Sequence, residues 1–554
     1  MPTHNMIKIA LAQLNYHIGN FEQNTRKIID NIKRAKQQGA DLVVFSELSI
    51  CGYPSGDFLE FSDYIHKCDK ALEQILPYCD TVAAIVGAPH RNLSGKGKPL
   101  FNAAFFLENQ KVKHIYHKGL LPNYDIFDEY RYFEPATGFH ITEFKGKRIA
   151  ISICEDLWNL NDNPLYTGNP MEELAEQGAE IIINIAASPF SWDHRTERET
   201  MLTQNASKYR LPLFYVNQVG AQTEIVFDGG SMAINPEGEI VGELKYFEED
   251  FKIFQVDKIL NQKGRIPERG EDENRKIEVI YQALILGIKD YFGKIGFKQA
   301  ILGLSGGIDS AVTMAIAADS LGAENVLGVL MPSAFSSDHS VADAQQLAKN
   351  LGCPFYEIPI KNTTDSFEAH LKPWFENLPF NVAEENIQAR TRAVYLMALS
   401  NKFGHVLLNT SNKSEAAVGY GTLYGDMCGG LSVLGDVYKT DVFRLARYIN
   451  KDLERIPVNS ITKPPSAELR PDQKDSDSLP EYDILDPILF NYIELRKSPG
   501  EIYELGLDKK IVDRVLKMVN TCEYKRYQTP PVIRVSSKAF GMGRKMPIVA
   551  RYLG

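Results

Sequence analysis

The chain of 554 residues is too long to fold around one hydrophobic core, so we expect two or more domains. Hydrophobic residues make up 44% and charged residues 24%, as in an ordinary globular protein. No apolar run approaches membrane-spanning length, and the first residues lack the layout of a signal peptide. The formal net charge of -10 argues against a nucleic-acid binder, so local cations must meet any anionic substrate. The seven cysteines are dispersed without a Cys-x-x-Cys pair, which favours a reducing, cytoplasmic location over a disulfide framework or a structural zinc site.

The first half of the chain, from about residue 6 to 257, alternates short apolar runs with helical stretches. The apolar runs are nearly continuous, which indicates sheets covered on both faces. Several runs end in polar residues, and α/β sheets place their chemistry at strand ends. The expected strands include 41–47, 148–154, 180–188 and 213–217, and the expected helices include 21–38 and 171–177.

The second half begins after a charged stretch containing glycine and proline, which we interpret as the connection between domains. We predict domains over 1–262 and 276–554, joined by a linker over 263–275. A helix is expected from about 276 to 292, followed by a second βα alternation. Two later stretches, 457–487 and 524–547, are rich in proline and charge. They are either ligand-covering loops or surface excursions, and composition alone slightly favours surface excursions.

The segment 302–310 reads Leu-Gly-Leu-Ser-Gly-Gly-Ile-Asp-Ser and predicts a phosphate-binding turn between a buried strand over 300–304 and a helix over 311–321. Glycines bring backbone N–H groups close to a ligand, and a helix N-terminus favours an anion. Ser305 and Ser310 add hydroxyl donors, and no lysine follows the second glycine as it would in a Walker A loop. Asp309 at this place favours a metal-bridged pyrophosphate as the leaving group. The alternative is an ordinary strand-to-helix turn.

Three residues of the first half have the chemistry that a nucleophilic cysteine needs. Glu47 and Cys154 each close an apolar run, and Lys118 follows the run over 111–116. A nucleophilic cysteine needs a base to take its proton and a donor to stabilise the oxyanion that forms next. Taken singly, each residue has an ordinary alternative: a solvated glutamate, a surface lysine and a small core cysteine.

The contexts of these residues, Phe-Ser-Glu47-Leu, Lys118-x-x-Leu-Pro and Cys154-Glu-Asp-Leu-Trp, resemble the nitrilase superfamily in composition and in order. The resemblance implies a four-layer αββα sandwich. It also implies that Glu47 is the general base, that Lys118 stabilises the tetrahedral intermediate and that Cys154 is the nucleophile. An amide would acylate Cys154 and release ammonia, and water would then hydrolyse the thioester. Glu129 matches a second carboxylate that positions this site.

Further positions match residues that contact glutamine in the glutaminase members of that superfamily. These are Tyr124, Ser188 and His194. His194 stands where many members carry lysine, and Thr223 stands where many carry aspartate.

The second half carries four more polar segments downstream of the glycine turn. Arg390 and Arg392 belong to an expected helix over 384–392, in which Gln388 and Arg392 share one face. Considered alone, such a helix is usually a solvated face, and the other segments would be loops. The remaining candidates, each in a short polar segment, are Thr410, Glu415, Asp426, Lys439 and Lys525.

Together with the turn over 302–310, which is similar to the pyrophosphate loop of ATP-pyrophosphatase enzymes, these segments resemble the NAD synthetase family. The resemblance implies a doubly wound parallel sheet and an enzyme that adenylates deamido-NAD and lets ammonia displace AMP. It assigns ATP to Leu304, Ser305, Gly306, Gly307, Asp309, Ser310, Thr410 and Lys439. It assigns Mg²⁺ to Asp309 and Glu415, and deamido-NAD to Arg390, Glu415, Asp426 and Lys525.

The resemblance covers the whole chain and predicts that ammonia from glutamine is used to make NAD. It implies small-molecule substrates (glutamine, ATP and deamido-NAD) and a homo-oligomer, with neither nucleic acid nor membrane as a partner. Three rivals stay open, of which two are another ATP-adenylating amidotransferase and a carbon–nitrogen hydrolase with an ATP-binding regulatory half. A third is a regulatory protein whose degenerate nitrilase-like domain senses glutamine, although Glu47, Lys118 and Cys154 are all present.

Overall fold

The computed structural model describes residues 6–160, 165–267, 273–376, 378–471 and 473–553. The chain divides into two compact units, Met1–Glu271 and Asp272–Gly554. Among the described residues, no helix combines the length and the apolar character needed to cross a membrane.

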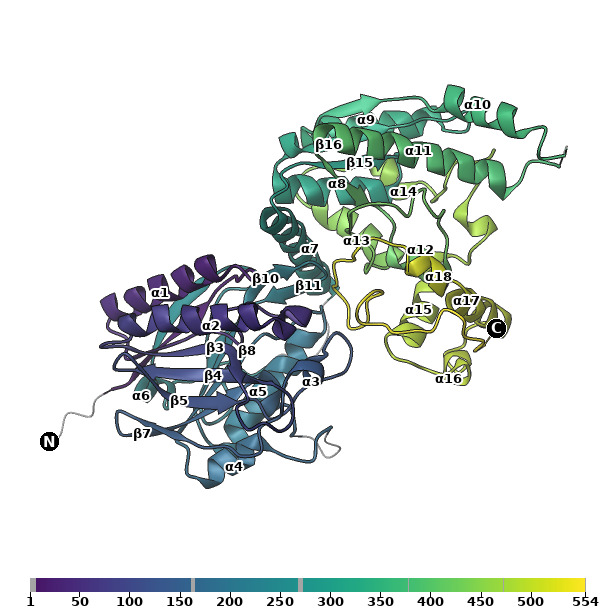
Figure 1. Ribbon diagram of the computed structural model, residues 1–554. Coiled ribbons are helices and arrows are strands. Elements are labelled where there is room, and N and C mark those ends of the chain that lie inside the picture. The colour runs from purple at the N-terminus through teal and green to yellow at the C-terminus, as the bar shows by residue number, and fades with distance from the viewer. Residues whose placement is uncertain (1–5, 161–164, 268–272, 377, 472, 554) are drawn as a thin grey trace. The chain divides into compact units, whose positions relative to one another are not determined.

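The first unit is built on two six-stranded sheets (Figure 1). One sheet has the order β14 (Asp250–Gln255), β1 (Lys8–Gln13), β2 (Leu42–Val44), β3 (Ala83–Arg91), β4 (Leu100–Glu108), β5 (Lys111–His117). The other has the order β13 (Ile240–Glu243), β12 (Met232–Ile234), β9 (Leu213–Asn217), β8 (Ile181–Ala186), β7 (Lys147–Ile153), β6 (Thr142–Phe144). A short hairpin adds β10 (Val219–Gln222) and β11 (Ile225–Asp228).

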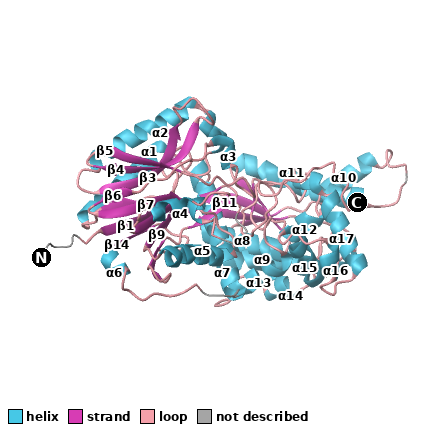
Figure 2. Ribbon diagram, turned by 90° about the horizontal axis from the view of Figure 1, so that it is seen from below, coloured by secondary structure: helices cyan, strands magenta, loops and turns pink. Residues whose placement is uncertain are grey.

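The two sheets share a core, because residues such as Ile9 and Leu42 of one sheet cluster with Ile151 and Ile183 of the other. Helices α1 (Phe21–Gln37) and α2 (Ser62–Ile75) pack on the outer face of the first sheet, as Figure 2 shows. On the second sheet lie α4 (Pro170–Glu176) and α5 (His194–Tyr209). Strand β8 is buried along its whole length, which explains its unbroken apolar sequence. The expected αββα sandwich is confirmed.

The second unit has a five-stranded parallel sheet in the order β17 (Phe355–Glu357), β16 (Val326–Leu330), β15 (Ala300–Leu304), β18 (Val406–Asn409), β19 (Leu431–Ser432). This is a doubly wound order: from β15 the sheet grows in one direction through β16 and β17 and in the other through β18 and β19. The expected doubly wound sheet is confirmed. The helices around it are α7 (Glu273–Ile295), α8 (Ile308–Leu321), α9 (Asp338–Leu351), α10 (Lys361–Leu371), α11 (Val382–Phe403) and α13 (Lys439–Ile449).

The end of the chain adds mostly short helices with a core of their own around Leu485, Leu489 and Val515. They are α12 (Lys413–Val418), α14 (Val458–Thr462), α15 (Tyr482–Ile493), α16 (Pro499–Tyr503), α17 (Lys509–Thr521) and α18 (Glu523–Arg526). The stretch over 457–487, expected to form ligand-covering loops or surface excursions, contains α14 and the start of α15. Pro487 lies inside α15, where neighbouring buried residues hold the helix together.

The region between the domains also differs in part from expectation. Arg265, inside the predicted linker, pairs with Ile240 through two backbone hydrogen bonds of 2.7 and 3.0 Å. Its guanidinium contacts Glu199 and Glu243 at 2.6–2.9 Å. This part of the segment is thus attached to the first unit, and α7 begins at Glu273. The rest of the predicted linker includes 268–272, which lie outside the described residues.

Candidate functional site

The residues predicted for amide hydrolysis meet in a buried cluster of the first unit. Glu47 follows β2, and Cys154 follows β7 at the start of a short 3-10 helix, Cys154–Leu157. The backbone of Cys154 has φ of 43°, a left-handed conformation that costs energy in a residue with a Cβ. Such a turn at the end of a strand presents the thiol at the rim of the sheet.

Lys118 lies at the centre of this cluster with no exposed surface. Its ammonium donates to Glu47 Oε1 at 2.8 Å and to both oxygens of Glu129 at 2.9 Å. Burial opposes the positive charge, but Glu129 and Glu47 hold the pKa of Lys118 well above its usual value. Lys118 is therefore a fixed cation beside the cysteine.

Glu47 and Glu129 have further partners that sequence reasoning missed. Asn102 Nδ2 donates to Glu47 Oε1 at 2.7 Å, and the hydroxyl of Tyr53 donates to Glu129 Oε1 at 3.0 Å. The backbone N–H of Ala187 donates to Glu47 Oε2 at 2.9 Å. These donors come from segments distant in sequence from the groups that they contact, so no local pattern reveals them.

The charges of the cluster leave a negative excess, since one ammonium lies between two carboxylates. Burial raises the pKa of Glu129 to about 7, although Lys118 opposes the shift. Burial and the negative charge of Glu47 raise the pKa of the Cys154 thiol. The thiol is therefore neutral at rest, and a thiolate forms only if a base takes its proton as it attacks.

The two residues after Cys154 tie its turn to the Lys118 segment. Asp156 accepts from the backbone N–H groups of Gly119 and Leu120, each at 2.9 Å. Glu155 is buried and accepts from the hydroxyl of Tyr124 at 2.9 Å. Tyr124, a predicted glutamine contact, is thereby held beside the nucleophile segment.

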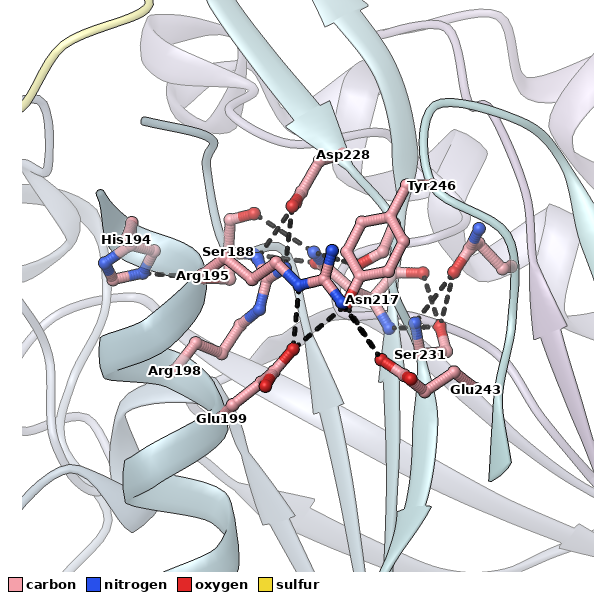
Figure 3. Close-up of polar contacts among 12 residues, drawn as sticks. Ser188, His194, Arg195, Arg198, Glu199, Asn217, Asp228, Ser231, Glu243 and Tyr246 are labelled. Atoms are coloured by element: carbon pink, nitrogen blue, oxygen red, sulfur yellow. Dashed lines mark hydrogen bonds and ion pairs between the residues drawn. The ribbon is translucent and has the colours of Figure 1, made fainter. Parts of the chain in front are cut away.

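The other two predicted glutamine contacts also meet (Figure 3). Ser188 Oγ lies 3.2 Å from His194 Nε2, and the imidazole stacks on Trp158 with ring centroids 5.2 Å apart. His194 opens helix α5, and Ser188 follows strand β8. Thr223 lies apart, at the turn between β10 and β11 with φ of 56°.

In the second unit the glycine turn has the expected strand-to-helix form, except that α8 begins three residues early, at Ile308. Asp309 and Ser310 are therefore in its first turn. Gly306 has φ of 78°, and a Cβ there would lie 2.2 Å from the carbonyl oxygen of Ser340. Only glycine fits such a close backbone approach. Ser305 Oγ accepts from the N–H of Gly307 at 3.2 Å and lies 3.3 Å from Ser310 Oγ.

The predicted metal ligands converge on one lysine. Lys439 Nζ donates to Asp309 Oδ2 at 2.5 Å and to Glu415 Oε1 at 3.5 Å. Asn412 Nδ2 donates to Asp309 Oδ1 at 2.9 Å, and Asn412 forms a capping box with Glu415. Asn412 was not among the predicted residues, although the Asn-x-x-Glu spacing of a capping box is visible in the sequence.

Two carboxylates close to one cation site suit Mg²⁺, which takes one or two protein carboxylates and completes its shell with water and phosphate oxygens. Burial raises the pKa of Glu415 to about 8, opposed by Lys439 and reinforced by Asp309. A further cation beside Glu415 would favour the deprotonated, charged form of its carboxyl group. Within the described ranges, no group of three or more His, Cys, Asp and Glu side chains is arranged for a metal.

Two cavities meet beside the glycine turn. One of about 470 Å³ is lined by the turn, Thr410, Glu415, Asp426 and Lys439. The other, of about 240 Å³, lies among apolar residues at the ends of β15, β16 and β18 and includes Leu304 and Arg392. Ser305, Thr410 and Asp426 line both cavities.

The stretch over 457–487 supplies one wall of these cavities, so its favoured interpretation as a surface excursion is wrong. Lys463, Ser466 and Glu468 line the larger cavity. Glu468 accepts from the hydroxyls of Ser337 and Ser340 at 2.9 and 2.7 Å, which holds the segment across α9.

Two predicted dinucleotide contacts lie outside both cavity linings. Arg390 is exposed on α11 and donates to the carbonyl of Leu423 at 3.2 Å. Lys525 donates to the carbonyls of Gly419 and Gly421 at 2.7 and 2.8 Å. Arg392 lines the smaller cavity instead, and burial lowers its pKa to about 10.

Comparison with known proteins decides the family. Residues 8–262 match the carbon-nitrogen hydrolase family, and residues 280–529 match the NAD synthase family. A glutamine-dependent NAD(+) synthetase of Synechocystis sp. is 44% identical over 559 residues, covering 99% of each chain. This chain belongs to the glutamine-dependent NAD synthetase family. A second member, from Acinetobacter baylyi, is 43% identical and covers 98% of each chain.

Solved structures of this family agree with the assignment. The glutamine-dependent NAD+ synthetase of Acinetobacter baumannii, solved with ADP, is 39% identical, with a TM-score of 0.77 over 98% of this chain and 99% of that one. The synthetase of Cytophaga hutchinsonii, 21% identical with a TM-score of 0.84 over 99% and 98%, shows the same fold. An ATP-regulated hydrolase or another amidotransferase is therefore not favoured.

Proposed function

We propose that the chain makes NAD from deamido-NAD, ATP and glutamine, with AMP, pyrophosphate and glutamate as the other products. The observation that carries the proposal is the presence of two complete polar centres in one chain. One joins Cys154 to Glu47, Lys118 and Glu129, and the other joins the glycine turn to Asp309, Glu415 and Lys439.

In the first centre, the Cys154 sulfur attacks the side-chain amide carbon of glutamine. Glu47 takes the thiol proton and passes it to the departing ammonia, and Lys118 stabilises the oxyanion. Glu129 holds Lys118 in place. Water then cleaves the thioester and releases glutamate. Tyr124, Ser188 and His194 bind the amino-acid end of glutamine.

In the second centre, the carboxylate of deamido-NAD attacks the α-phosphorus of ATP and pyrophosphate leaves. Backbone N–H groups and the hydroxyls of Ser305 and Ser310 bind the departing phosphates. Mg²⁺, held by Asp309 and Glu415, would neutralise their charge. Ammonia then attacks the acyl carbon of the adenylate and AMP leaves.

The two cavities supply binding space for these substrates. The apolar cavity with Leu304 and Arg392 suits an adenine ring, and the larger polar cavity suits phosphates and the nicotinate part of deamido-NAD. Thr410 and Asp426 stand between them. Arg390 and Lys525 stay proposed dinucleotide contacts, and both lie outside the cavity linings.

We also propose a homo-oligomer and a reducing, cytoplasmic location. Helix α11 presents Val394 and Met397 to solvent, 64% and 39% exposed, on the same face as Arg390. Tyr424, 70% exposed, follows the carbonyl that Arg390 contacts. A second copy of the chain would cover these apolar groups. The seven cysteines are all free thiols, which suits a reducing compartment.

The test compares NAD formation by wild type and Cys154→Ala, each with deamido-NAD and Mg-ATP, and with either glutamine or ammonium chloride. We expect the variant to lose glutamine-driven synthesis and to keep ammonia-driven synthesis within about twofold, because only the first centre loses its nucleophile. A wild type that makes no NAD from either nitrogen source would refute the synthetase assignment. A variant that still uses glutamine would refute Cys154 as the nucleophile.

A further inference from the structure

The peptide of Ser188 is held on both sides by one buried amide, that of Asn217 (Figure 3). The N–H of Ser188 donates to Asn217 Oδ1 at 2.8 Å, and Asn217 Nδ2 donates to the carbonyl of Ser188 at 3.1 Å. Asn217 has no exposed surface, and Ser188 is 4% exposed. Asn217 ends β9, which pairs in parallel with β8, so its side chain reaches the residues just beyond the neighbouring strand.

Asn217 is itself fixed by the segment between β11 and β12. Its Nδ2 also donates to the carbonyl of Gly229 at 3.1 Å, and its backbone N–H donates to Ser231 Oγ at 3.0 Å. The hydroxyl and the N–H of Ser231 donate to Gln13 Oε1, each at 2.9 Å. This chain of buried hydrogen bonds connects both sheets of the first unit, which makes Asn217 a rigid support.

The turn that Asn217 supports faces the candidate glutaminase centre in two ways. The N–H of Ala187 donates to Glu47 Oε2 at 2.9 Å, and the next residue, Ser188, places its hydroxyl 3.2 Å from His194. A shift of the 187–188 peptide would therefore disturb the base and the glutamine contact together.

We propose that Asn217 is a positioning residue for glutamine hydrolysis. It locks the turn after β8 so that the Ala187 N–H meets the carboxylate of Glu47 and the Ser188 hydroxyl meets the substrate. This inference rests on the proposed function of the first centre. An amide suits the task because a side chain of this size must both accept from an N–H and donate to carbonyls.

The test measures kcat and KM for glutamine hydrolysis in the full-length protein, for wild type, Asn217→Ala, Asn217→Asp and a matched control, Asn235→Ala. Asn235 is also a buried asparagine of this unit, 2% exposed, whose side chain bonds to backbone groups of its own turn and to Gln262. We expect Asn217→Ala to lower kcat/KM about tenfold or more, because small misplacements of catalytic groups are costly. The control should stay within about twofold of wild type.

Asn217→Asp gives a readout that loss of packing would not produce. Its carboxyl can still accept from the Ser188 N–H, but it can donate to a carbonyl only while protonated. The ratio of variant to wild-type kcat/KM should therefore fall as pH rises from 6 to 9. If Asn217→Ala does not fold, the pH dependence of Asn217→Asp still tests whether Asn217 is a positioning residue.

The inference is overturned if Asn217→Ala keeps wild-type kcat/KM, if Asn235→Ala loses as much, or if the Asn217→Asp ratio does not change with pH. A wild-type protein without glutamine hydrolysis would instead count against the proposed function.

Discussion

Glu415 is a buried acid whose charge depends on its neighbours. Burial raises its pKa from the ordinary value of 4.5 to about 8, with Lys439 opposing and Asp309 reinforcing the shift. The folded protein therefore holds a proton there between about pH 4.5 and 8 that the unfolded chain has lost. The stabilisation from this group is fully present below pH 4.5 and is lost as pH rises through 8.

We predict that Glu415→Gln removes this pH dependence. Between pH 5 and 8, the thermal unfolding temperature of wild type should fall relative to that of the variant, because the buried carboxyl loses its proton in the folded state. Calorimetric melts across that range, without nucleotide or metal, measure the effect. The matched control is Glu504→Gln, at an exposed position of the same unit. Parallel curves for wild type and Glu415→Gln would contradict the raised pKa.

Helix α12 carries Asn412 at its N-cap and Glu415 in its first turn, so its placement sets the second centre. With only six residues, it cannot be stable through its own hydrogen bonds. Lys413 fixes one side of it, since the buried ammonium contacts Asp436 at 2.8 Å, Ser536 at 2.8 Å and Glu494. At its C-terminus, Arg526 donates to the carbonyls of Ala416 and Ala417.

We predict that Lys413→Met destabilises the second unit by about 3–5 kcal/mol, because it leaves two buried carboxylates without their cation. Denaturant unfolding followed by circular dichroism measures the loss. Lys402→Met, at an exposed position of α11, should change stability by less than about 0.5 kcal/mol. A Lys413→Met protein as stable as this control would show that the network does not hold α12.

At the scale of the whole molecule, each unit contains its own core and its own candidate centre. The proposed chemistry explains why one chain carries both centres. A carboxylate becomes a good acyl donor only after adenylation, and ammonia in water near pH 7 is mostly the unreactive ammonium ion. A chain that also hydrolyses glutamine generates ammonia for its own second reaction.

We predict that the exposed face of α11 joins two copies of the chain. Val394→Glu should shift the mass measured by light scattering after size exclusion toward the monomer, because a desolvated charge opposes burial of that face. Leu505→Glu, at a half-exposed leucine of the same unit outside α11, should leave the mass unchanged. If wild type is monomeric at micromolar concentration, or if Val394→Glu leaves the mass unchanged, this interface is wrong.

The pattern of apolar runs predicts an α/β protein, and the resemblance to two families supplies the αββα sandwich, the doubly wound sheet and the candidate residues of the two centres. Strands such as β8 and β15 are continuous apolar runs in the sequence. Glycines mark the phosphate turn, and a capping box marks the start of α12. All of these are local signals. Glu47 and Cys154 were visible because each ends such a run.

The groups that support those residues could not be predicted from the sequence. Asn102, the Ala187 N–H and Asn217 act across strands that are far apart in the chain, and Arg392 rather than Arg390 lines a cavity. The stretch over 457–487 has a polar, proline-rich composition that looks the same on a surface or over a cavity. Composition and spacing report how a residue relates to its near neighbours in sequence. Hydrogen-bond partners and cavity walls depend instead on how the strands and helices pack.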